Sequence, residues 1–216
     1  MQRSLVVAID GPSGSGKSSV SRAVARMFAM AYLDTGAMYR AYTWLALHGH
    51  SNLSTCRLVV STDPDRPSVV AEGTDITDAI RGLEVTSAVS EVAARPDVRA
   101  LAVQEQRRII AEALNGIVIE GRDITSVVAP DAQVRIFLTA DIAAREARRA
   151  AEFADPALAD RMRATVSARD VLDASREHSP LVQQAGVVAV DATHRTLEET
   201  IDVVANLVRA AQRSSS

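Results

Sequence analysis

The chain lacks the features that several protein classes need. Its 216 residues include one cysteine, Cys56, so an internal disulfide framework is excluded and a reducing compartment is indicated. No apolar run approaches the roughly 20 residues of a membrane-spanning helix. The 24 Lys and Arg nearly cancel the 27 Asp and Glu, which leaves no general basic field for a nucleic-acid polymer. We expect a cytoplasmic protein without membrane or nucleic-acid partners.

Hydrophobic residues make up 47% of the chain, which is ample for a core, and their order predicts a fold class. Short β-branched runs at 5–9, 116–120, 134–138 and 187–190 alternate with longer helical patterns. Such alternation is typical of a parallel sheet with helices on both faces. The chain is therefore expected to form a single α/β domain.

The first and last helical patterns have clear apolar faces. In the first, the apolar face is expected to run from Val20 through Met27 to Ala31. The last helix is expected at 197–211. The residues from Arg213 onward are predicted to be a frayed tail.

Two regions interrupt this alternation of strands and helices. From about 36 to 100, turn signals flank a short predicted strand at 69–71, which favours a small inserted subdomain. From about 145 to 176, arginines stand among alanines and acidic residues, with few large apolar side chains. We expect this second region to be a mobile helical lid, although an alanine-rich surface helix has the same composition.

The strongest chemical signal is the glycine-rich segment at 11–18, which directly follows the first predicted strand. Its spacing is that of a loop that cradles phosphate where a helix begins. Glycines let the backbone N–H groups turn inward, and the helix adds the positive end of its dipole. Lys17 would reach the outer phosphates and Ser18 would bind magnesium. A flexible linker would not stand between an apolar strand and an amphipathic helix.

Two further segments follow predicted strands, at the edge where ligands bind in open α/β sheets. Thr35 would emerge at a strand end, with Arg40 one turn into the next helix. Arg122 and Asp123 would leave another strand, whose last residue, Glu120, is placed to orient magnesium-bound water. A helix cap for Thr35 and a surface position for Arg40 are the alternatives for the first segment. A surface ion pair between Arg122 and Asp123 is the alternative for the second.

Two predicted helices carry further arginines. If residues around 170 are helical, Arg169, Asp173 and Arg176 fall on one side, so two guanidinium groups flank a carboxylate. A self-neutralising salt-bridge ladder is the alternative. A helix that begins at Pro96 places Arg99 at the border of its apolar face.

Taken in order, these motifs resemble those of bacterial cytidylate kinases. The resemblance runs nearly end to end, and the order and spacing of the motifs are far more specific than any one motif. It rests on residues 10–18, 34–40, 81, 96–99, 121–123, 130–131, 136–138, 169–170 and 179–181. It implies a P-loop three-layer α/β fold with a parallel central sheet, an inserted subdomain that binds a nucleoside monophosphate, and a helical lid. It also implies transfer of the γ-phosphate of ATP to CMP or dCMP, with Mg²⁺ as cofactor. We expect a monomer.

The resemblance implies roles for individual residues as well. ATP would lie on the glycine-rich loop, against Gly11, Pro12, Ser13, Gly14, Ser15, Gly16, Lys17, Ser18 and Ser19. The acceptor's sugar would contact Thr35, Arg169 and Asp173, its base Ser90, Arg99 and Asp123, and its phosphate Arg40, Arg122 and Arg176. Charge on the transferring group would be neutralised by Lys17, Arg122, Arg148, Arg149 and Arg176. Magnesium would contact Ser18 and, through water, Glu120.

The chain departs from this family's pattern in three places. Thr125 stands where the family usually has glycine, so we expect a different turn there. The segments 48–81 and 149–169 are shorter than is usual in the family. These departures concern the insert, the lid and one turn, and they leave the implied reaction unchanged.

Two other functions share a phosphate loop. One is a kinase for UMP or for a non-nucleotide alcohol, but an alcohol acceptor would call for a catalytic base, whereas this chain offers arginines. The other is a nucleotide-dependent switch, but the chain has no Asn-Lys-x-Asp guanine-reading motif. Among nucleotide acceptors, Asp123 favours CMP, because it can accept a hydrogen bond from the exocyclic amine that uracil lacks.

Overall fold

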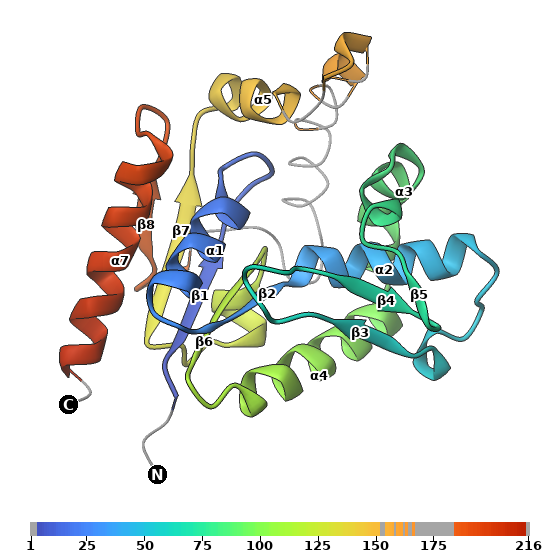
Figure 1. Cartoon of the computed structure of the whole chain (residues 1–216), viewed down its shortest axis with the longest axis horizontal. Coiled ribbons are helices and arrows are strands. Elements are labelled where there is room, and N and C mark those ends of the chain that lie inside the picture. Colours follow the sequence, from blue (N-terminus) through green and yellow to red (C-terminus); the bar gives the residue numbers. More distant parts are fainter. Residues whose placement is uncertain are drawn as a thin grey trace.

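The computed structural model describes residues 4–151, 154–157, 159–161, 163, 166 and 184–214, and all structural statements below refer to these residues. Their centre is a five-stranded sheet with the strand order β2-β6-β1-β7-β8 (Figure 1). The strands are β1 (Val6–Asp10), β2 (Ala31–Asp34), β6 (Ile117–Gly121), β7 (Val134–Thr139) and β8 (Val188–Asp191). Every pairing among them is parallel. The predicted parallel sheet is confirmed.

The strand register brings three strand ends to one edge. Asp10 pairs with Gly121 on the neighbouring strand, and Asp34 pairs with Glu120 on the other side of β6. The residues that follow β1, β2 and β6 therefore leave the sheet side by side. The side chains of β6 are all buried, as expected for a central strand covered on both faces.

Helices cover both faces of the sheet and complete three layers. On one face, α1 (Lys17–Met27) and α7 (Leu197–Ser214) pack on the side chains that include Val7 and Ile9. On the other, α2 (Thr35–Leu47), α4 (Pro96–Glu112) and the single turn η3 (Ile124–Val128) pack around Ala8 and Leu33. Alternate residues of β1 face opposite layers, which is the period of a strand. The fold is the expected three-layer α/β fold.

The two outer helices differ from expectation at their ends. The first helix stops at Met27, whose side chain is half exposed, and Ala31 already belongs to β2. The buried face of the helix ends with Val24 and Ala25, and the turn after the helix places Ala29 at a φ of 52°. The last helix extends to Ser214, whose hydroxyl donates to the Ala210 carbonyl, so the predicted fraying at Arg213 is wrong. Alanine and arginine are good helix formers, which explains the extension.

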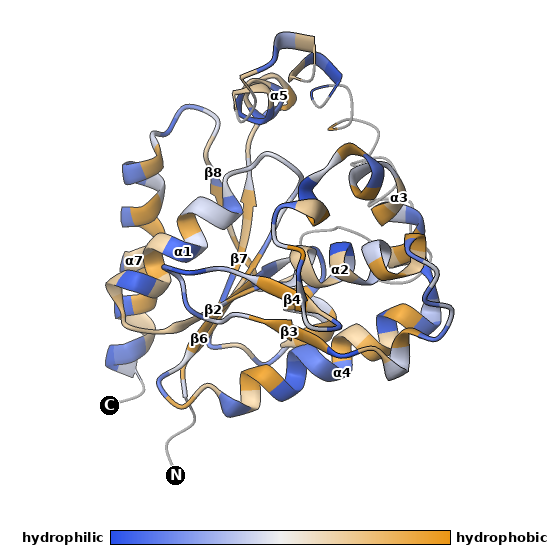
Figure 2. Cartoon of the chain, turned by 45° about the vertical axis from the view of Figure 1, so that its right-hand side comes forward, coloured by the Kyte–Doolittle hydropathy of each residue, from blue (hydrophilic) through white to orange (hydrophobic). Residues whose placement is uncertain are grey.

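Between α2 and α4 the chain builds a smaller unit with its own core. Its strands β3 (Leu58–Val60), β4 (Val69–Ala71) and β5 (Thr74–Asp75) form an antiparallel sheet, and β4 is the strand predicted there. The turns η1 (Leu53–Thr55) and η2 (Ala79–Arg81) and the helix α3 (Leu83–Ala94) complete it. Figure 2 shows hydrophobic residues along β3 and β4, where this unit packs on α2. The unit is called the insert below.

The helix α5 (Ile142–Ala150) follows β7 and stands beyond the edge at which β1, β2 and β6 end (Figure 1). The Asp141 carboxylate accepts a hydrogen bond from the Ala144 N–H and so caps its first turn. No helix among the described residues is long and apolar enough to span a bilayer.

Candidate active site

A cavity of about 360 Å³ opens at the edge where β1, β2 and β6 end. The glycine-rich loop, α2, the insert, α4 and α5 all contribute to its wall. Among the residues predicted for the site, those that line it are Ser13, Gly14, Gly16, Lys17, Ser18, Ser19, Thr35, Arg40, Ser90, Arg99, Glu120, Arg122, Asp123 and Arg149. Segments far apart in the sequence therefore meet at this cavity. Arg169, Asp173 and Arg176 lie outside the described residues.

The glycine-rich loop has the backbone that anion binding needs. Gly14 and Gly16 have φ angles of 75° and 94°, which side-chain-bearing residues rarely adopt. At Gly11 an added Cβ would lie 2.0 Å from the carbonyl oxygen of Leu138. Gly16 is the N-cap of α1 and provides no side-chain cap, so the first N–H groups of the helix remain available to a phosphate.

Cationic side chains hold the outward-facing carbonyls of this loop. Lys17 Nζ donates to the Pro12 carbonyl at 2.8 Å, and Arg122 Nη1 donates to that of Gly11 at 2.8 Å. From α5, Arg145 Nη1 donates to the Ser13 carbonyl at 3.1 Å. The same arginine is buried and its Nε donates to the Ala140 carbonyl at 2.9 Å. Arg145 thus fastens α5 to the loop.

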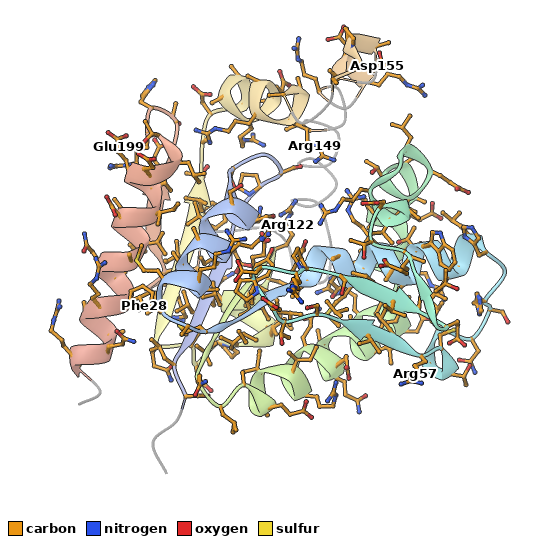
Figure 3. The ribbon with its side chains drawn as sticks, in the orientation of Figure 1. Phe28, Arg57, Arg122, Arg149, Asp155 and Glu199 are labelled. Atoms are coloured by element: carbon orange, nitrogen blue, oxygen red, sulfur yellow. The ribbon has the colours of Figure 1, made fainter. Side chains whose placement is uncertain are left out.

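The two arginines predicted to lie over the transferring phosphate take different places. Arg149 lines the cavity, whereas Arg148 does not. Instead, Arg148 Nη2 donates to the Ala192 carbonyl at 2.6 Å, and its Nη1 lies 3.5 Å from the Ser15 carbonyl. In Figure 3, Arg149 and Arg122 lie between the loop and the insert. Gly11, Pro12 and Ser15 shape the loop without lining the cavity.

Glu120 is a buried carboxylate at the end of β6, beside the start of α1. Its Oε1 accepts a hydrogen bond of 2.6 Å from the Tyr32 hydroxyl. Burial, followed by the charge of Asp34, raises the pKa of Glu120, while Lys17 and hydrogen bonds from Tyr32 and Ser18 oppose the rise. A hydroxyl and a carboxylate that already touch are ligands suited to magnesium. Within the described part of the chain, no three His, Cys, Asp or Glu side chains cluster in a way that could hold a metal ion.

Thr35 links the exits of two strands. Its hydroxyl donates to the Glu120 carbonyl at 2.7 Å, and the residue is buried. The cap of α2 is Asp34, whose Oδ1 accepts from the Ala37 N–H at 2.9 Å, so Thr35 is not the helix cap. Its position at the cavity wall is therefore set by β6.

Arg40 is held by the insert rather than lying on the surface. Its Nη1 donates to the Ile80 carbonyl and to the Thr86 hydroxyl, each at 2.9 Å. Burial, together with the positive charge of Arg149, lowers the pKa of Arg40 to about 10. The charges of Arg81 and Arg122 act in the same direction. Four guanidinium groups thus repel one another around the cavity, which is the electrostatic signature of an anion site.

The predicted base-reading residues also come together. Arg99 and Asp123 form a buried ion pair, so Asp123 does not pair with Arg122. Arg99 also lies 5.8 Å above the centre of the Tyr39 ring. The Ser90 hydroxyl, nearby in the cavity wall, is buried and makes no hydrogen bond within the described structure. A buried hydroxyl without a hydrogen bond is disfavoured unless a ligand or a water molecule supplies a partner.

Comparisons with known proteins agree with this geometry. The family model described as cytidylate kinase matches residues 7–210. A cytidylate kinase of Streptomyces griseus is 45% identical over 215 residues, which cover 95% of this chain and 93% of the relative. A cytidylate kinase of Streptomyces avermitilis is 44% identical over 214 residues, covering 94% and 92%. The chain belongs to the cytidylate kinase family.

Membership of this family makes the chain an ATP-dependent nucleotide kinase. Among solved structures, a shikimate kinase from Bacteroides thetaiotaomicron matches with a TM-score of 0.51 at 12% identity, covering 95% of this chain and 98% of that one. At this identity the match concerns the fold alone, which is that of the P-loop kinases.

The sequence alone assigns no role in the site to three residues, although Arg81 is among those that carry the family resemblance. Tyr32 orients Glu120, and Arg145 holds the loop, through contacts made across the fold. Arg81 lines the cavity and its Nη2 lies 4.0 Å from Asp34 Oδ2. The spacing of Arg145 from Arg148 and Arg149 marks them as one helical face, but only the structure shows which carbonyls they reach.

The buried ion pair predicts a large stability effect. Replacing Arg99 by methionine leaves the Asp123 carboxylate buried without its partner, and we expect a loss of about 3–5 kcal/mol in the free energy of unfolding. Urea denaturation of the purified chain measures it. The control is Arg95→Met, which breaks an exposed pair with Asp97 and is expected to cost far less stability. Equal losses in the two variants would contradict the buried pairing.

The raised pKa of Glu120 predicts that removing its charge stabilises the fold at neutral pH. Because its pKa is raised in the folded chain, ionisation at neutral pH destabilises the fold. Glu120→Gln is expected to unfold at higher urea concentration than the unmodified chain at pH 7. The difference should shrink as the pH falls to the usual carboxyl range near about 4. The exposed Glu91→Gln in α3 is the control. A pH-independent difference, or a less stable Glu120→Gln variant at pH 7, would rule out this interpretation.

Proposed function

We propose that this cytidylate kinase family member transfers the γ-phosphate of ATP to CMP or dCMP, giving ADP and CDP or dCDP. One observation carries the proposal: the phosphate loop and a second group of guanidinium side chains face the same cavity. A loop alone fits any nucleotide-binding protein. Arg40 and Arg122 in the cavity wall supply charge for a second phosphate, and Arg149 supplies charge for the transferring group.

The acceptor requires little acid–base chemistry. A phosphate monoester has its second pKa near about 6, so at neutral pH it already carries an anionic oxygen that can attack. The main barrier is the approach of two anions in line. The N–H groups of the loop, Lys17 and the arginines of the cavity offset this repulsion and stabilise the charge on the transferring group.

Magnesium, when bound with ATP, would neutralise charge on the phosphates and help to align them. Ser18 would contact the ion directly, and Glu120 would do so through water. Tyr32 donates to one oxygen of Glu120 and so restricts the rotation of its carboxylate.

The insert and the segment from 145 to 176 have separate roles in this proposal. The insert, within 36–100, binds the acceptor, because it fixes Arg40 through Ile80 and Thr86. The segment that begins with α5 closes over the phosphates, with Arg149 nearest to them. Arg148 would instead hold the phosphate loop from outside the cavity, through its contacts with backbone carbonyls. Arg169 and Asp173 would bind the sugar, and Arg176 the acceptor phosphate.

Arg122 gives a direct test of the acceptor side. Arg122→Ala removes a guanidinium from both the loop and the acceptor phosphate, so we expect kcat/KM for CMP to fall by about 10³-fold. ATP binding, measured by calorimetric titration, should change little because the backbone cradle and Lys17 remain. The exposed Arg57→Ala variant in the insert is the control. Near-normal kcat and KM for CMP in Arg122→Ala would refute the assignment.

Base reading is tested with a panel of acceptors. Asp123 and Ser90 can bond the amine edge of cytosine, so the unmodified chain is expected to prefer CMP over UMP by about 10²-fold or more in kcat/KM. ADP release in a coupled assay measures this ratio. Ser90→Ala is expected to lower kcat/KM for CMP, so that the ratio of kcat/KM between CMP and UMP becomes smaller. Equal kcat/KM for CMP and UMP would remove the base-reading role from Asp123 and Ser90.

A further inference from the structure

A buried carboxylate lies where the phosphate loop meets the acceptor side of the cavity. Asp10 is the last residue of β1 and directly precedes the loop, and only 1% of its surface is exposed. Its Oδ1 accepts from the Ile124 N–H at 2.9 Å. Its Oδ2 accepts from the Thr125 N–H at 2.8 Å and from the Thr125 hydroxyl at 2.7 Å. Both oxygens are therefore engaged by one turn of another element.

These hydrogen bonds stabilise a charge that burial disfavours. Desolvation raises the pKa of Asp10, and the negative charge of Asp123 adds to the rise. The donors from Thr125 and Ile124 oppose it. Three donors of η3 bond to the two oxygens of Asp10, so the turn is bound to the end of β1 at three points.

Thr125 itself does not touch the cavity. It is buried in η3, three residues after Arg122 and two after Asp123, and it is absent from the cavity wall. Its backbone has no left-handed φ, so the turn does not require glycine at this position. What threonine adds is the hydroxyl that bonds to Asp10.

A second connection joins the same two segments. Arg122 donates to the Gly11 carbonyl, one residue beyond Asp10. Asp10 and Gly11 are thus fastened to the segment 122–125 at two successive points. This segment carries the guanidinium for the acceptor phosphate and the carboxylate for the base.

We propose that Thr125, through the bond from its hydroxyl to Asp10, is a positioning residue that aligns the phosphate loop with Arg122 and Asp123 for phosphoryl transfer. The inference rests on the proposed function. Each nucleotide keeps its own contacts when this bond is lost, so binding of either one alone is largely preserved. What changes is the alignment of the two phosphates, to which in-line transfer is far more sensitive than binding is.

The experiment compares three variants with the unmodified chain. Thr125→Val keeps the shape of the side chain and removes its hydroxyl. Thr125→Ser keeps the hydroxyl and removes the methyl group. Thr200→Val is the matched control, since the hydroxyl of the buried Thr200 in α7 donates to the Thr196 carbonyl just before that helix, remote from the cavity. Steady-state kinetics with ATP and CMP give kcat and both KM values, and thermal denaturation confirms folding. If Thr125→Val does not fold, Thr125→Ala is measured in its place.

We expect Thr125→Val to lower kcat by about tenfold while both KM values stay within about twofold. Thr125→Ser should restore kcat, and Thr200→Val should leave it unchanged. A Thr125→Val variant with unchanged kcat would overturn the inference, as would an equal loss in Thr125→Ser or in Thr200→Val. If the unmodified chain releases no ADP with CMP, the proposed function fails instead. The proposed function is tested on the unmodified chain and the inference on the Thr125→Val variant, so the two failures are distinguishable.

Discussion

The parallel pairing of β1 with β6 is the constraint on which the site depends. Its register sets Asp10 opposite Gly121, so the phosphate loop and the segment with Arg122 and Asp123 leave the sheet as neighbours. Because β2 pairs with the other side of β6, Thr35 and α2 join them at the same edge. Ligands bind at this edge in open α/β sheets because helix N-termini and loops converge there. The insert and α5 provide the remaining walls of the cavity, whose centre is positioned by the strands.

The cavity concentrates charges that do not stabilise the fold. Several guanidinium groups face one another, and their mutual repulsion, together with burial, lowers the pKa of Arg40. Glu120 is a buried carboxylate, and its burial disfavours its ionised form. Arg99 with Asp123 is the exception, because opposite charges compensate one another there. Active sites often carry such strain, since groups arranged for a charged transition state are left exposed to one another without ligand.

The sequence predicts the elements of this fold well and its cross-links poorly. The strands, the loop and the exits that carry Thr35 and Arg122 follow from local pattern, because strand ends and glycine spacing are local properties. One hydrogen bond joins Tyr32 to Glu120 and another joins Thr125 to Asp10. The partners in each are about 90 or more positions apart in the sequence, so no local pattern marks these bonds. The contrast between Arg148 and Arg149 depends on the direction of each side chain. The apolar period of α1 continues to Ala31, past the turn that ends the helix at Met27, so the sequence pattern places the end of the helix too late.

We propose that the phosphate loop and the arginines that line the same cavity form one site for two nucleotides. An adenosine and a cytidine joined through their 5′ ends by five phosphates would span that site, and calorimetric titration measures its binding. We expect one equivalent to bind per chain and to displace both a fluorescent ATP analogue and a fluorescent CMP analogue. Displacement of only one analogue, or binding of two equivalents, would contradict a shared cavity.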